Sequence, residues 1–198
     1  MRTPMSRTTA VTTLVATAVL AGGAIAVPAQ AQPHTAPRPA VLTQAAPAEK
    51  ASPAAAKSTR QQTLQRARTW LTANGGRQVP YSQSKTWKDG YRQDCSGYVS
   101  MALRLAKPGP NTVALAKTRS LTRPIAMNQL KPGDLVIDAI GDGNSRHVVI
   151  FEKWNNAAHT SYTAYEQRGR HGTDHRSLTY GLKSGSQYKA YRPVQYGD

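Results

Sequence analysis

The chain contains little cysteine. Cys95 is the only cysteine in 198 residues, so no disulfide can form within the chain. Secreted domains of this size often carry disulfides, which come in pairs. Three interpretations of Cys95 therefore stand: a buried inert thiol, an intermolecular bridge, or a nucleophile.

Acidic charge is also scarce, with 10 Asp and Glu against 26 Lys and Arg, for a net charge of +16. The basic residues are spread along the chain, which argues against a nucleic-acid-binding arm. If the protein is secreted, it meets anionic cell-wall polymers and lipid headgroups before DNA. We therefore expect anionic cell-wall polymers as partners, no nucleic acid, and a monomer. A basic surface that serves solubility alone is the alternative.

The N-terminal segment has the pattern of a secretory signal. Arg2 and Arg7 precede the apolar stretch VTTLVATAVLAGGAIAV, and AQA follows at 29–31. This order predicts a signal peptide over residues 1–31. A membrane anchor is the alternative, but roughly 17 residues are the lower limit for spanning and glycines interrupt the run. We predict a secreted, extracellular or wall-associated protein without stable membrane insertion.

Residues 32–57 lack aromatic side chains and are rich in alanine and proline. Such a segment cannot bury enough apolar surface to fold, which predicts a linker or spacer; a pro-segment is the alternative. Residues 58–198 are long enough for one domain with its own core.

The setting of Cys95 predicts a helix N-terminus. Asp94 is a good N-cap, and KPGP at 107–110 stops a helix. Apolar residues recur at helical spacing between these points: Tyr98, Val99, Ala102, Leu103 and Ala106. We therefore predict a helix over residues 95–106.

That position favours the nucleophile interpretation. The unpaired amides and dipole of a helix N-terminus stabilise a thiolate. The same amides can bind the oxyanion of a tetrahedral intermediate. Gly97 would leave room for the backbone of a substrate.

A thiol nucleophile needs a base and a residue that orients that base. His147 opens the predicted strand HVVIFEKW, 147–154; a strand-end histidine bonded to backbone is the alternative. The next predicted strand, 161–167, carries Glu166 and Gln167. Which of the two faces His147 depends on the register of the strands, and His159 in the intervening turn is a third candidate.

These elements predict an α+β fold, in which the cysteine helix packs on an antiparallel sheet. An N-terminal helix is expected over residues 59–73. The strands are expected near 134–140, 147–154, 161–167 and 187–192.

Two other groups of residues could bind ligands. His171 and His175 would share a helix face suited to zinc, but Gly172 and Thr173 favour a loop, so we predict neither a metal nor another cofactor.

The tryptophans differ in setting. We expect Trp70 in the core and Trp87 exposed on a loop, where it could contact a ligand. Trp154 ends a strand and could do either.

Taken in order, several motifs resemble the NlpC-type cell-wall cysteine peptidases, which have a papain-like fold. They are VPY with Tyr81, DCSG at 94–97, KPGDL at 131–135 and HVVIF at 147–151, and the resemblance covers about residues 62–195. It implies that Cys95 is the nucleophile and His147 the base, with Tyr81 beside the thiol, where it can contact the substrate or intermediate. It assigns the role of the third catalytic residue, which orients His147, to Glu166 or to the adjacent Gln167. Asp94, Ser96 and Trp87 are expected to contact substrate.

The same resemblance implies a substrate. Bacterial members act on peptidoglycan stem peptides, commonly between D-glutamate and the following diamino acid. An amidase or acyltransferase using the same Cys-His pair is one alternative. A non-catalytic, basic wall-binding protein is another.

Overall fold

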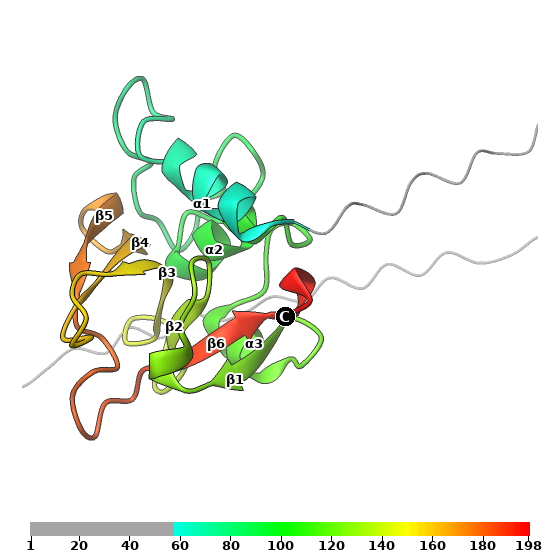
Figure 1. Cartoon of the computed structure of the whole chain (residues 1–198). Helices are drawn as coiled ribbons and strands as arrows, with labels where there is room; N and C mark the ends of the chain where they lie inside the picture. The colour runs from blue at the N-terminus through cyan, green and yellow to red at the C-terminus, as the bar shows by residue number, and fades with distance from the viewer. Residues whose placement is uncertain (1–57) are drawn as a thin grey trace, which may run out of the picture. The chain divides into compact units, whose positions relative to one another are not determined.

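The computed structural model describes residues 58–198, so the expectations for residues 1–31 and 32–57 lie outside the described range. Within that range six strands form one sheet in the order β1-β6-β2-β3-β4-β5 (Figure 1). The strands are β1 (Thr122–Ile125), β2 (Leu135–Asp138), β3 (His147–Trp154), β4 (Tyr162–Arg168), β5 (Gly172–Leu178) and β6 (Lys189–Pro193).

Every pair of neighbouring strands is antiparallel. The α-helices of this range are α1 (Arg60–Thr69), α2 (Cys95–Leu103) and α3 (Thr112–Lys117), with short 3-10 turns at Met127–Gln129 and Val194–Tyr196. The predicted α+β class with an antiparallel sheet is confirmed.

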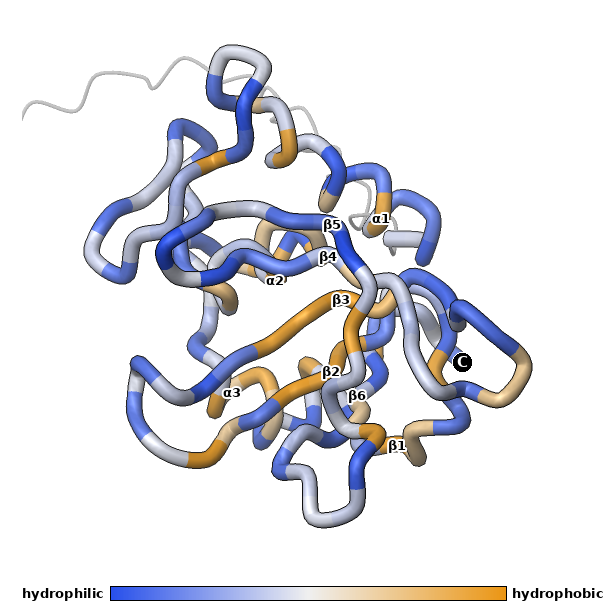
Figure 2. The backbone as a smooth tube through the Cα atoms, turned by 90° about the vertical axis from the view of Figure 1, so that its left-hand side faces the viewer, coloured by the Kyte–Doolittle hydropathy of each residue, from blue (hydrophilic) through white to orange (hydrophobic). Residues whose placement is uncertain are grey.

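The centre of the sheet is its most apolar part. Figure 2 shows hydrophobic residues concentrated in β2 and β3. Leu135 to Asp138 are all buried, as are Val148 to Phe151. Strands covered on both faces read as continuous apolar runs, and two clusters of buried side chains lie on the two faces of this sheet.

Helix α2 is the buried helix of the domain, and all nine of its residues are buried. It packs against α1, β3 and β4 (Figure 1). As predicted, Asp94 caps it by accepting a hydrogen bond from the Gly97 amide. The helix ends at Leu103 rather than at residue 106, because Arg104 adopts a left-handed conformation with φ of 56°.

Gly97 has a different purpose from the one expected. A Cβ built there would lie 2.1 Å from the carbonyl oxygen of Arg92. The space beside Gly97 is therefore filled by the chain that leads into α2, and not reserved for a substrate backbone.

Helix α1 begins with a capping box between Thr59 and Gln62, which satisfies two otherwise unpaired amides. It ends at Thr69, earlier than expected, and the chain then turns through Gly75 and Gly76 with positive φ. Trp70 is 1% exposed and confirms the prediction of a core residue.

One α-helix and two strands were not predicted: α3, β1 and β5. The HGTDH segment belongs mainly to β5, so the expectation of a loop there was wrong. This strand matters because it pairs with β4, the strand that carries Glu166. None of the helices formed by residues 58–198 combines the length and the apolar character needed to cross a bilayer.

Candidate active site

Cys95 is the first residue of α2 and is 6% exposed. Its Sγ lies 3.7 Å from Oγ1 of Thr112, the first residue of α3. In the part of the chain that the structure describes, the amides of Cys95 and Ser96 donate to no protein group. These two amides are the unpaired donors expected at a helix start.

Asp94 holds the turn that presents the thiol. Its Oδ1 accepts hydrogen bonds from the Gly97 amide at 2.6 Å and from Ser96 Oγ at 2.9 Å. Its Oδ2 accepts from Arg92 Nε at 2.8 Å. The Asp94 carboxylate therefore already has a cationic partner, Arg92. Asp94 and Ser96 also line the cavity beside Cys95.

His147 and Glu166 form a close pair across β3 and β4. Val149 stands opposite Glu166 in the ladder, and His147, two residues before Val149, points to the same face. The His147 Nε2 lies 2.7 Å from Glu166 Oε2. The other ring nitrogen, Nδ1, does not contact Glu166 and is left to interact with the Cys95 thiol.

The neighbouring groups favour the ionised form of both Glu166 and His147. Glu166 is fully buried and also pairs with Arg176 of β5. Burial alone would raise the pKa of Glu166, but His147 and Arg176 hold this pKa below its ordinary value.

For His147, burial alone would lower the pKa. The adjacent Cys95 thiol and the hydrogen bond to Glu166 outweigh burial and raise the pKa to about 9. The surroundings of His147 thus favour its protonated form, and a cationic imidazole is the partner that a cysteine nucleophile needs.

Gln167 points to the opposite face and does not contact His147. Its Nε2 donates to the carbonyl oxygens of Val79, Pro80 and Gln93 at 3.1–3.3 Å. Its Oε1 accepts from Thr173. Gln167 therefore ties β4 to the segments that lead to Tyr81 and Cys95, and of the two candidates Glu166 is the residue that faces the imidazole.

The other histidines of residues 58–198 lie away from this pair. His159 is in the hairpin at the far end of β3, where it stacks on Trp154 with ring centroids 4.0 Å apart. His175 pairs with Glu152 at 2.9 Å, and His171 lies 3.6 Å from Asp174. Among residues 58–198, no cluster of three or more His, Cys, Asp or Glu side chains is arranged to hold a metal ion.

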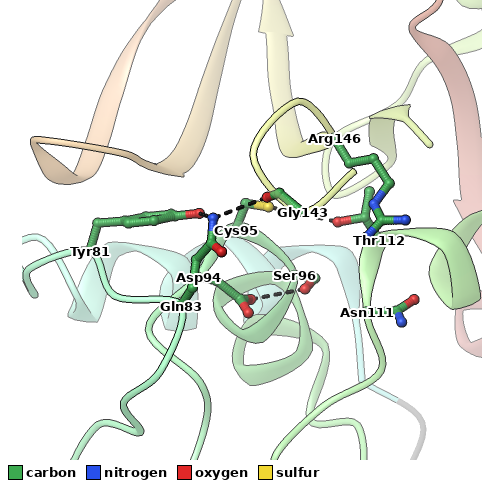
Figure 3. Close-up of a pocket in the computed structure, with 9 residues that line it drawn as sticks. All are labelled: Tyr81, Gln83, Asp94, Cys95, Ser96, Asn111, Thr112, Gly143 and Arg146. Atoms are coloured by element: carbon green, nitrogen blue, oxygen red, sulfur yellow. Dashed lines mark hydrogen bonds between the residues drawn. The ribbon is translucent and has the colours of Figure 1, made fainter. Parts of the chain in front are cut away.

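Two cavities flank the catalytic candidates. We call the first the Cys95 cavity; its volume is about 120 Å³ (Figure 3). It is lined by Tyr81, Gln83, Asp94, Cys95, Ser96, Asn111, Thr112, Gly143 and Arg146.

The second, the His147 cavity, has a volume of about 620 Å³. It is lined by Tyr81, Gln83, Asn144, Ser145, Arg146, His147, Glu166, Arg168, Gly169, Arg170, Tyr180 and Tyr188. Tyr81, Gln83 and Arg146 belong to both linings, so they mark the boundary between the two cavities.

Tyr81 lies beside the thiol, as expected. Its hydroxyl accepts a hydrogen bond of 3.3 Å from Gln83 Nε2, which also donates to the Gly143 carbonyl across the site (Figure 3). The same Nε2 donates to Asn144 Oδ1. Burial raises the pKa of Tyr81, so its hydroxyl is neutral at physiological pH.

Trp87 lines neither of these cavities. It is half-buried and packs against the core cluster that includes Cys95 and Tyr98. Trp87 is thus less exposed than expected, and its contact with a substrate stays a prediction.

Several site residues escaped the sequence analysis: Gln83, Thr112, Arg146 and Arg176. Arg176 lies on β5, whose sequence GTDHRSL lacks the apolar alternation that signals a strand. Arg146 directly precedes His147, and this adjacency in the sequence was the signal that could have placed Arg146 near the site.

No protein-family model matches the chain. A search of curated proteins likewise gives no match. The chemistry of the site is therefore assigned from its geometry.

Proposed function

We propose that this domain is a cysteine hydrolase that cleaves amide bonds. The observation that carries the proposal is a set of three groups: a thiol at a helix N-terminus, an imidazole whose pKa that thiol helps to raise, and a buried carboxylate 2.7 Å from the imidazole. Nucleophilic catalysis by cysteine requires these three roles.

In the acylation step, the Cys95 thiolate attacks the carbonyl carbon of the amide. The carbonyl oxygen becomes an oxyanion, for which the free amides of Cys95 and Ser96 are available donors. The C–N bond then breaks. The leaving nitrogen takes a proton from the His147 imidazolium, and the acyl group remains on Cys95 as a thioester.

In the deacylation step, a water molecule attacks the thioester carbonyl while neutral His147 accepts one of its protons. The C–S bond breaks, the carboxylic product leaves, and Cys95 returns as a thiolate beside protonated His147. Glu166 stays ionised throughout. It orients the ring and stabilises its positive charge.

The motif resemblance extends the proposal to the fold family and the substrate. We assign the domain to the NlpC-type peptidases with a papain-like fold, acting outside the cell on peptidoglycan stem peptides. The bond between D-glutamate and the diamino acid is the proposed cleavage site. The net charge of +16 suits a protein that works among anionic wall polymers.

A digest of purified peptidoglycan tests this function. Mass spectrometry of the released fragments should identify stem peptides cut at the D-glutamyl bond. The Cys95→Ala variant, with its fold checked by circular dichroism, should release none. Equal release by both proteins would contradict the proposal, and wall binding without release would favour a binding protein.

A further inference from the structure

Arg146 differs from the other buried and half-buried arginines of residues 58–198. Its guanidinium forms neither an ion pair nor a hydrogen bond with any described residue, although the side chain is half-buried. In the other arginines of this kind the guanidinium donates at least one hydrogen bond to the protein: Arg60, Arg66, Arg92, Arg168, Arg176 and Arg192. A guanidinium carries five donors that a partly buried site would normally satisfy.

The location of Arg146 connects it with the reaction. It lies at the boundary of both cavities, immediately before His147. Figure 3 shows its guanidinium reaching from the β2–β3 loop into the Cys95 cavity, toward Thr112. Thr112 is the residue whose hydroxyl lies 3.7 Å from the thiol.

No free acid in the Cys95 cavity balances this charge. Asp94 is the acidic residue of its lining, and Asp94 is already paired with Arg92. Apart from Cys95, which the proposed mechanism pairs with His147, the remaining wall of the cavity carries no acidic side chain. Asp142 of the same loop interacts with Arg146 through space, but its carboxylate is hydrogen-bonded to the amides of Asn144 and Ser145. An anion entering the cavity would thus meet a guanidinium without a hydrogen-bonded partner among residues 58–198, and the geometry of a guanidinium suits a carboxylate well.

The two cavities correspond to the two sides of the bond to be cleaved. His147 lines one cavity and delivers the proton to the leaving amine, so the amine side occupies the His147 cavity. The acyl side, which becomes attached to Cys95, occupies the Cys95 cavity. About 120 Å³ accommodates a carboxylate and its neighbouring carbon, since one water occupies roughly 30 Å³.

We infer that Arg146 determines specificity by binding a carboxylate on the acyl residue of the substrate, close to the carbonyl that Cys95 attacks. This inference rests on the proposed function, because it takes the Cys-His chemistry as given. The substrate class is an acyl donor with a free carboxylate a few bonds from the scissile carbonyl. A donor whose carboxylate is replaced by a carboxamide is a poor substrate.

Three synthetic stem tetrapeptides, L-Ala-D-Glu-diaminopimelate-D-Ala, test the inference. In one both the D-Glu α-carboxyl and the diamino-acid side-chain carboxyl are free. In the second peptide the D-Glu α-carboxyl is replaced by a carboxamide. In the third peptide the diamino-acid side-chain carboxyl is replaced by a carboxamide. For the wild-type protein, kcat/KM should fall about 10- to 100-fold for the second peptide, the loss expected for a charge-assisted hydrogen bond. It should change less than threefold for the third.

The variant Arg146→Gln should lose the same factor on the first peptide and almost nothing on the second. Arg146→Lys should recover part of the loss, because it keeps the charge without the fork of donors. Arg77→Gln is the matched control; Arg77 is exposed and lines neither cavity. A merely structural role for Arg146 would lower activity on all three peptides alike and would overturn the inference.

Calorimetric binding to the Cys95→Ala variant separates this inference from the proposed function. The first peptide should bind at least tenfold more tightly than the second, and adding Arg146→Gln should abolish the difference. This result would support the carboxylate site even if the wild-type protein cleaved no peptide. A preference that depends only on the diamino-acid carboxyl would instead point to Arg168 and Arg170 in the His147 cavity and would overturn the assignment.

Discussion

Replacing Glu166 by glutamine tests the role of the buried carboxylate. The substitution keeps the shape and a hydrogen-bonding group beside His147 but removes the negative charge. The pKa of His147 is raised from 6.5 to about 9, which corresponds to about 3 kcal/mol in favour of the protonated ring. Cys95 and Glu166 share this effect, so we assign roughly half, about 1–2 kcal/mol, to Glu166.

Two effects are expected for Glu166→Gln. The imidazolium becomes easier to deprotonate, so the alkaline limb of the kcat/KM profile should move to lower pH by about one unit. Turnover at neutral pH should fall by about 10- to 1000-fold, less than for Cys95→Ala, because an orienting residue contributes less than the nucleophile. Peptide hydrolysis measured from pH 5 to pH 10 gives both quantities.

Glu152→Gln is the matched control for that experiment. Glu152 forms a second carboxylate–imidazole pair, with His175 at 2.9 Å, on the same sheet but away from Cys95. Its substitution should leave the pH profile in place. A Glu166→Gln variant with an unshifted profile and nearly full turnover would refute the role assigned to Glu166.

Three further predictions concern reactivity and stability. Cys95 should react with iodoacetamide at pH 6 faster than free cysteine, because protonated His147 and the helix N-terminus stabilise the thiolate; a rate equal to that of an ordinary thiol would contradict this. Gln167→Ala should lower the melting temperature while leaving the pH profile unchanged, since Gln167 bonds to the Val79 carbonyl and to two others but not to His147. The free energy of unfolding should decrease as pH rises from about 6.5 through about 9, because the raised pKa of His147 stabilises the fold only while the ring is protonated; denaturant titrations should find a smaller decrease in Glu166→Gln.

Strong periodic patterns were sufficient to predict the central part of the fold. The apolar run HVVIFEKW gave strand β3 with its observed bounds, and the DCSG start gave the first residue of α2. Both depend on local signals, namely a buried apolar stretch and an N-cap. The helix ends were less predictable, because Arg104 adopts a left-handed conformation that favours glycine.

The candidate site was predictable for residues whose type and local motif indicate a catalytic role, as is the case for Cys95 and His147. The choice between Glu166 and Gln167 required the register of β3 and β4, which one residue of slippage would reverse. Arg176 required a strand with few apolar residues to be recognised beside β4. These contacts are made between distant parts of the chain, and no local pattern encodes them.

The mass of Cys95 during turnover tests the central claim most directly. Wild-type protein mixed with stem peptide and quenched in acid within the first turnovers should carry an acyl group on Cys95, identified by peptide mapping as a thioester. Glu166→Gln should carry the same adduct, formed more slowly. Peptide cleavage without an adduct on Cys95, persisting in Cys95→Ala, would contradict the account.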